Sequence, residues 1–129
     1  MPQLLQYLDE IARDKKRDAL FLKFDKDIFF KYERSIVRKR ILTWFDQNAI
    51  PYKECMAGTS DKGGGWYLGE VYLDVPFDTE NEQYKRLAAY LEDDKGKVKH
   101  RNVGFYIYPY ASAINIVPRD YSDSESLLD

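Results

Sequence analysis

The chain has 129 residues, which is enough for one domain with a hydrophobic core and too few for two. Its 44% hydrophobic and 33% charged residues are ordinary for a globular protein. Its aromatic content of 16% is high, and a core of this size cannot bury all eleven tyrosines and also give each hydroxyl a hydrogen-bond partner. A net charge of −2 excludes both a strongly basic nucleic-acid binder and an acidic DNA mimic, so electrostatic attraction to a partner must be local.

Helical and extended patterns alternate along the first half of the chain. Apolar residues at helical spacing predict a short helix over residues 3–13, and the alternating ALFLKF predicts a strand over residues 19–24. Apolar residues at helical spacing predict a longer amphipathic helix from residue 28 to about residue 48. It ends there because the proline at position 51 disfavours helical geometry in the residue before it. We expect a strand over residues 52–56 to follow.

The second half begins with a glycine-rich loop, residues 57–65, which leads into a predicted strand over residues 66–75. A capping sequence with acidic residues in its first turn predicts a helix over residues 79–93. Two strands, residues 103–108 and 113–117, are then expected to form a hairpin.

The resulting order, α-β-α-β-β-α-β-β, predicts an α+β fold. Without its first helix and last strand it becomes β-α-β-β-α-β, which is the order of the ferredoxin-like fold. We therefore predict a ferredoxin-like antiparallel sheet with both crossover helices on one face, an extra N-terminal helix and an extra C-terminal strand. One domain is expected over residues 1–118, followed by an acidic, Ser/Asp-rich mobile tail over residues 119–129.

The sheet face that lacks the crossover helices is expected to carry aromatic side chains. Alternation along the strand over residues 66–75 sends Tyr67 and Val71 toward the helices and Trp66 and Tyr72 away from them. Aromatic side chains on an open sheet anchor protein partners or stack unpaired bases, and they can also pack beneath the N-terminal helix. The candidate partner-binding residues are Trp66, Leu68, Tyr72, Tyr106, Tyr108 and Tyr110.

Basic residues gather on the long helix and in the run KVKHR, residues 97–101, before the strand that starts at residue 103. Such groups meet phosphate or an acidic partner, and they are also typical of solvated surfaces. Arg40 lies in the apolar arc of the long helix, where it snorkels, pairs with Glu33 or another carboxylate, or belongs to a site. We expect His100 to be an exposed loop residue. The candidate basic patch comprises Lys31, Arg34, Arg38, Lys39, Lys99 and Arg101.

One stretch of the chain bears on nucleic-acid binding. Residues 101–108 keep Arg101, Gly104, Phe105 and Tyr108 of the RNP1 pattern that RNA-recognition modules use for stacking, but they carry Asn102 and Val103 where that pattern has glycine and an aromatic residue. The match is therefore incomplete.

The first predicted strand ends in an aspartate, LFLKFD, and an Arg/Lys-rich helix follows it. This arrangement over residues 20–54 resembles the small ferredoxin-fold nucleases of CRISPR adaptation, and the resemblance implies a metal bound by Asp25 across a dimer. The turn and N-cap of the long helix explain Asp25 and Asp27 more simply.

The single cysteine, Cys55, excludes an intramolecular disulfide and a cysteine-clustered zinc site, and we find no secretory signal and no run of ~18 apolar residues. We therefore expect a cytoplasmic protein without a membrane segment, a metal or a small-molecule cofactor.

Three functions remain, in order of preference. The first is a non-enzymatic interaction domain, such as an inhibitor, immunity or accessory factor, that binds a protein partner or a second copy of itself through the aromatic sheet face. The second is single-stranded nucleic-acid (RNA) binding by aromatic stacking with help from the basic patch. The third is a metal-dependent nuclease that uses Asp25.

Overall fold

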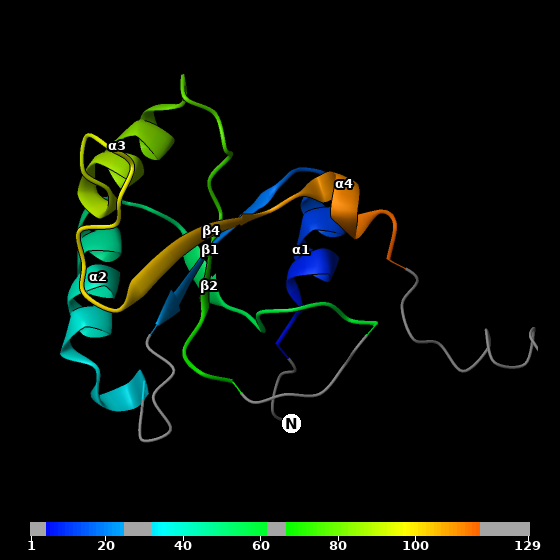
Figure 1. The fold of residues 1–129 in the computed structure, drawn as a ribbon, viewed down its shortest axis with the longest axis horizontal. Coiled ribbons are helices and arrows are strands. Elements are labelled where there is room, and N and C mark those ends of the chain that lie inside the picture. Colours follow the sequence, from blue (N-terminus) through cyan, green and yellow to red (C-terminus); the bar gives the residue numbers. More distant parts are fainter. Residues whose placement is uncertain (1–4, 25–31, 62–66, 117–129) are drawn as a thin grey trace, which may run out of the picture.

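The computed structural model describes residues 5–24, 32–61 and 67–116, and within them four strands pair into one antiparallel sheet (Figure 1). The strands are β1 Ala19–Phe24, β2 Tyr52–Glu54, β3 Val71–Leu73 and β4 Val103–Tyr108, and their order across the sheet is β2-β3-β1-β4. The helices are α1 Leu8–Lys15, α2 Ile36–Gln47, α3 Glu82–Leu91 and α4 Tyr110–Ala113, with a short 3-10 helix, η1 Tyr32–Arg34, before α2. The prediction of an α+β fold with an antiparallel sheet is confirmed.

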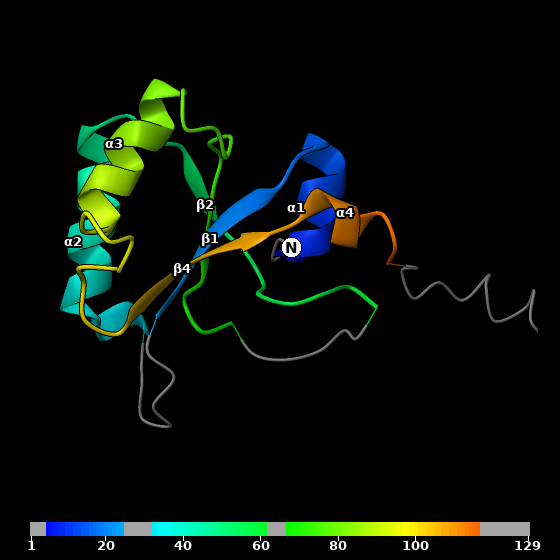
Figure 2. The same ribbon diagram turned by 45° about the horizontal axis from the view of Figure 1, so that its top comes forward.

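One face of the sheet carries the larger core, beneath α2 and α3 (Figure 2). Leu20, Leu22 and Phe24 of β1 point to this face, as the period of two in ALFLKF requires, and they pack with buried residues of both helices such as Ile41 and Leu87. Because the apolar residues of β1 and the apolar stripes of two helices meet here, this layer holds most of the buried hydrophobic side chains of the described chain.

The second face is covered at one end by α1 and α4, so it is not fully open (Figure 2). Leu8 and Ile11 of α1 pack with Phe21 and Tyr72, and Tyr72 keeps only 1% of its surface exposed. The Tyr72 hydroxyl donates to Asp74 Oδ1 at 3.0 Å, and burial raises the pKa of this tyrosine to about 12. The N-terminal helix therefore takes up one of the aromatic side chains predicted to meet a partner.

A buried carboxylate fastens α1 to its neighbours. Asp9 is fully buried and accepts hydrogen bonds from Arg13 Nη1 at 2.8 Å and from Ser60 N at 2.7 Å, as well as from the Ser60 hydroxyl. Burial raises the pKa of Asp9, but the bonds from Ser60 and Arg13 outweigh that effect and leave it below its usual range. Arg13 also donates to the carbonyl of Ala113, so the same ion pair joins α1 to the end of α4.

The predicted extra C-terminal strand over residues 113–117 is wrong. Residues 110–113 form α4, because Pro109 ends β4 and the backbone N–H of Tyr110 is held by Asp18 Oδ1 at 2.8 Å. Ala113 is then buried against α1, whereas Ile114 is 56% exposed. Residues 113–116 therefore end a helical turn, with Ala113 as its buried residue, and do not form a strand.

Four other elements are shorter than their predictions; among them, β2 ends at Glu54 and α3 extends only over Glu82–Leu91. The helix expected from residue 28 begins at Ile36, where the Ser35 hydroxyl caps it by accepting from the backbone N–H of Arg38 at 3.1 Å. The strand expected over residues 66–75 is restricted to Val71–Leu73, because Gly69 has a φ of +91° and lies against the Tyr32 side chain.

Several expectations fall outside the described residues: the tail, the glycines of the loop at residues 63–65, and Asp25 and Asp27. Among the helices that are described, none is long and apolar enough to cross a bilayer.

The contribution of α1 to stability can be measured with two isoleucines of opposite exposure. We expect Ile11→Ala to lower the free energy of unfolding by about 2–4 kcal/mol, since it removes a 1% exposed side chain from the contact between α1 and the sheet. Ile36→Ala makes the same chemical change at a 79% exposed position and should alter stability by less than about 0.5 kcal/mol. Urea denaturation followed by circular dichroism measures both, and equal losses would contradict the role of α1.

Candidate functional site

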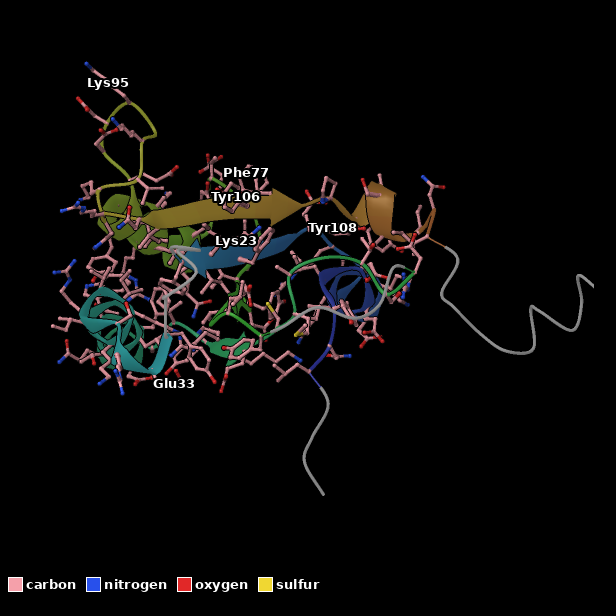
Figure 3. The ribbon with its side chains drawn as sticks, turned by 60° about the horizontal axis from the view of Figure 1, so that its bottom comes forward. Lys23, Glu33, Phe77, Lys95, Tyr106 and Tyr108 are labelled. Carbon is pink, nitrogen blue, oxygen red and sulfur yellow. The ribbon has the colours of Figure 1, made fainter. Side chains whose placement is uncertain are left out.

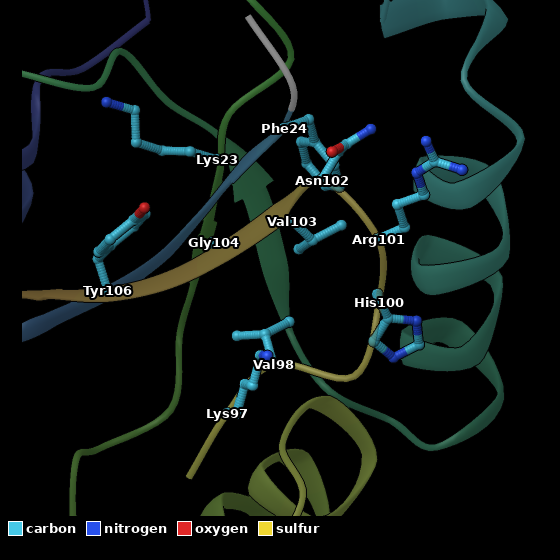
Figure 4. A pocket seen from close by; sticks show the side chains of 10 residues that line it. All are labelled: Lys23, Phe24, Lys97, Val98, His100, Arg101, Asn102, Val103, Gly104 and Tyr106. Atoms are coloured by element: carbon cyan, nitrogen blue, oxygen red, sulfur yellow. The ribbon is translucent and has the colours of Figure 1, made fainter.

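A groove of about 690 Å³ lies at the start of β4, where the α3–β4 connection passes the end of β1 (Figure 4). Three cationic side chains line this β4 groove, namely Lys23, Lys97 and Arg101, together with the imidazole of His100. None of the described residues that line it has a carboxylate. The groove is therefore a local concentration of positive charge on a chain whose net charge is −2.

Pairing of β1 with β4 brings the two sides of the groove together. Lys23 lies directly opposite Gly104, and Phe21 lies directly opposite Tyr106, so these four residues share the second face of the sheet. Figure 3 shows Lys23 and Tyr106 on neighbouring strands, with Tyr108 farther along β4 beside α1. The sheet thus places a residue of the first strand next to a segment that follows it by about eighty positions.

Tyr106 provides the exposed aromatic surface of the groove. Its side chain is 50% exposed, and its ring centroid lies 5.5 Å from that of Phe21. The ring also lies over Gly104, where any Cβ would collide with it. Glycine at position 104 therefore lets the tyrosine lie flat across its own strand instead of projecting into solvent.

The α3–β4 connection is held in shape by its own hydrogen bonds. The Asp93 carboxylate accepts from the backbone N–H groups of Lys95 and Lys97, each at 2.9 Å, and the bond from Lys97 is the main reason that the pKa of Asp93 is lowered. Val98 packs against the larger core, and the backbone N–H of Lys99 donates to Leu91 at 2.8 Å. Lys97 therefore reaches the groove from an ordered turn.

His100 lies in the α3–β4 connection, as predicted, but it is half-buried and not exposed. Its Nδ1 lies 3.3 Å from Arg40 Nη2, and its Nε2 lies 3.1 Å from the carbonyl of Tyr90. Because arginine only donates and a carbonyl only accepts, Nδ1 must be the acceptor and Nε2 must carry the hydrogen. Arg40 thus pairs with an imidazole, an alternative that the sequence does not reveal.

The candidate partner-binding residues do not form one surface. Tyr106 is exposed in the groove, whereas Tyr72 is buried and Tyr108 is half-buried against α1, where burial raises its pKa. Tyr110 is half-buried at the start of α4, and Leu68 is half-buried before β3. Trp66 lies outside the described residues.

The candidate basic patch is also divided. Arg38 is an internal connector, since it donates to the carbonyl of Gly69 at 3.0 Å and to the Tyr67 hydroxyl at 3.1 Å. The Lys99 ammonium donates to the carbonyl of Ala89 at 2.8 Å. Of the five that the structure describes, only Arg101 lines the groove, and Arg34 and Lys39 are exposed on η1 and α2. Lys31 lies outside the described residues.

The basic side chains of the groove other than Arg101, namely Lys23, Lys97 and His100, are absent from the candidate residues. Lys97 and His100 belong to the basic run that the sequence already displays, and Lys23 shares a strand face with Phe21 by alternation. The missing information was the pairing of β1 with β4. Asp25, the candidate metal ligand, lies outside the described residues, and the residues that are described contain no cluster of three or more metal-ligating side chains.

The environment of His100 gives a testable pKa, because this is the only histidine of the chain. Burial lowers the pKa of His100, and the positive charge of Arg40 lowers it further. Its contribution to stability is therefore complete above pH ~6.5 and is lost as the pH falls through the lower folded pKa.

We expect a nuclear magnetic resonance titration of the imidazole to show a midpoint below ~6.5 and the Nε2–H form at neutral pH. Arg40→Gln should raise that midpoint, whereas Arg34→Gln, a change at an exposed arginine of η1, should leave it unchanged. A midpoint at or above the ordinary value would contradict the described contacts.

No protein-family model matches this chain, and neither a curated protein nor a solved structure matches it. The chemistry of the β4 groove is consequently argued from its own residues.

Proposed function

We propose that this protein is a non-enzymatic interaction domain that binds an extended segment of a partner protein along the outer edge of β4. One observation carries the proposal: β4 is a six-residue edge strand, VGFYIY, that contains neither a charged residue nor proline. Edge strands in soluble proteins are normally kept from pairing with other chains by charges, proline, short length or a covering element.

The opposite edge of the same sheet follows that rule and serves as an internal comparison. β2 has only three residues, Tyr52–Glu54, and its Lys53 and Glu54 are exposed. A short, charged edge resists the addition of a strand, so the two edges differ in the feature that matters for binding.

The backbone of β4 supports the same proposal. Its register pairs all six residues with β1, and no other described segment makes a backbone hydrogen bond to residues 103–108. In a strand with a neighbour on one side only, half of the N–H and C=O groups point away from the sheet. An extended partner segment supplies hydrogen bonds to these groups, and the main chain then provides affinity that does not depend on sequence.

Side chains at the edge add apolar contact on both faces. Tyr106 is 50% exposed on the second face, and Ile107 is 40% exposed on the face of α2 and α3. Alternate residues of an added strand would pack on these two side chains. The first of the three functions expected from the sequence is therefore retained, with its surface moved from the centre of the second face to the edge at β4.

We also assign the sheet to the ferredoxin-like type. Support comes from the succession β1-α2-β2-β3-α3-β4, from the antiparallel order β2-β3-β1-β4 and from the position of α2 and α3 on one face. The cytoplasm is our proposed location, since a single buried thiol such as Cys55 suits a reducing compartment.

Single-stranded nucleic acid is the second candidate ligand, and the positive charge of the β4 groove is the observation that favours it. Stacking of successive bases needs several exposed aromatic rings. Of the tyrosines assigned to that role only Tyr106 is largely exposed, because α1 covers Tyr72 and partly covers Tyr108. We therefore place a protein partner first.

The proposed edge can be closed with one charge. We expect Ile107→Lys to reduce the amount of partner captured from a native lysate by about tenfold or more, because a lysine at the edge opposes the addition of a strand. Ile36→Lys, the same substitution at a 79% exposed position on α2, should capture as much partner as the unchanged protein.

Circular dichroism establishes that both variants remain folded, and mass spectrometry identifies what they retain. Nuclease treatment of the lysate should leave capture intact. Equal capture by Ile107→Lys and Ile36→Lys would refute the edge proposal, and loss of the captured material after nuclease treatment would favour nucleic acid.

A further inference from the structure

We propose that the β4 groove selects an acidic partner segment, so that the strand added to β4 carries carboxylates that meet Lys97, Arg101 and Lys23. This inference rests on the proposed function, since it specifies the chemistry of the segment that the edge accepts. It is carried by the position of the groove and by the state of its charges.

The cations of the groove differ from those at the other end of the same strands. Near the start of β1, Arg17 pairs with Asp74 at 2.7 Å and Lys15 pairs with the same carboxylate at 3.2 Å. In the groove, no ion pair joins Lys97 or Arg101 to a carboxylate of residues 5–24, 32–61 or 67–116. The fold thus pairs Lys15 and Arg17 with a carboxylate where α1 covers the sheet, whereas Lys97 and Arg101 beside the open edge form no ion pair with a described residue.

The groove lies where an added strand would end. It includes Gly104 and Val103 at the start of β4 and continues into Asn102 and Arg101, which precede that strand. A segment paired with β4 that extends past Val103 therefore passes over the groove with its terminal residues. Side chains that share a face of this segment are about 7 Å apart, so more than one can reach the groove.

Carboxylates fit this position better than phosphates do. The molecule as a whole offers a polyanion little attraction, because the chain has a net charge of −2 and the groove itself provides only three lysine and arginine side chains. An extended acidic segment obtains its main-chain bonds from β4 and needs only a few carboxylates over the groove. A nucleic acid cannot continue the ladder of alternating main-chain donors and acceptors along β4 as an extended peptide does.

His100 lines the groove without adding to its charge at neutral pH. Its ring hydrogen is held by the carbonyl of Tyr90, and its other nitrogen faces Arg40, which makes protonation unfavourable. The Asp93 carboxylate of the α3–β4 connection accepts from the backbone N–H groups of Lys95 and Lys97. The selecting charges are consequently those of the lysines and of Arg101.

The test uses the isotope-labelled full chain and two synthetic peptides, one alternating valine with glutamate and one alternating valine with lysine. We expect the glutamate peptide to shift the amide resonances of residues 103–108 and of residues 97–102, and to bind at least about tenfold more tightly than the lysine peptide at low salt. The difference should shrink as salt is raised.

Matched variants locate the effect. Lys97→Ser with Arg101→Ser should weaken binding of the glutamate peptide by about tenfold and leave binding of the lysine peptide unchanged or stronger. Lys16→Ser with Lys39→Ser removes two exposed charges that do not line the groove and should change neither affinity.

The outcomes distinguish this inference from the proposed function on which it rests. Equal binding of the two peptides, with shifts along β4, would refute acidic selection and leave strand addition standing. Absence of shifts along β4 with either peptide would refute strand addition itself. Tighter binding of oligothymidylate than of the glutamate peptide, with shifts centred on residues 97–102, would overturn the choice of a protein segment.

Discussion

The packing of α1 on Phe21 and Tyr72 determines which part of this protein remains available for binding. A four-stranded sheet with two helices on one face has a second face to cover, and here Leu8 and Ile11 cover the end where β1 begins and β4 finishes. The opposite end, with Lys23, Gly104 and the exposed Tyr106, stays accessible. Both the β4 groove and the uncovered edge depend on this uneven cover.

The packing of α1 on the sheet itself depends on a carboxylate whose burial costs free energy. Asp9 is completely enclosed, and it is tolerated because Arg13 and two groups of Ser60 compensate it. The same contacts tie α1 to α4 and to the loop that carries Ser60, so three segments distant in sequence are fixed by one carboxylate. At the other end of the sheet the α3–β4 connection is ordered separately, by Asp93 and by Val98. The accessible region therefore lies between two independently braced ends.

Local sequence patterns predict the helices and strands better than they predict which residues line the β4 groove. The period of two in ALFLKF identified β1 and its buried face, because alternation is a property of the strand alone. The same rule placed Tyr72 on the second face correctly, yet its burial depends on the docking of α1, which alternation cannot reveal. The alternation at residues 113–117 predicts a strand, but the hydrogen bond from the backbone N–H of Tyr110 to Asp18 starts a helical turn just before it. The sequence predicts Arg38 to be a surface cation, but in the structure its guanidinium donates to the carbonyl of Gly69 and to the Tyr67 hydroxyl. Each difference comes from a partner far away in the chain.

The open edge of β4 has a consequence for the protein when no ligand is present. An uncharged edge of six residues can pair with the same edge of another molecule as readily as with a ligand, and such pairing continues without limit when the geometry does not close. The lysines and the arginine beside that edge repel the same residues of a neighbouring molecule. The strength of this repulsion then sets the concentration up to which the free protein does not self-associate. Under the proposed function, charge beside the strand serves the unbound molecule as well, because it keeps identical chains apart until the acidic segment binds.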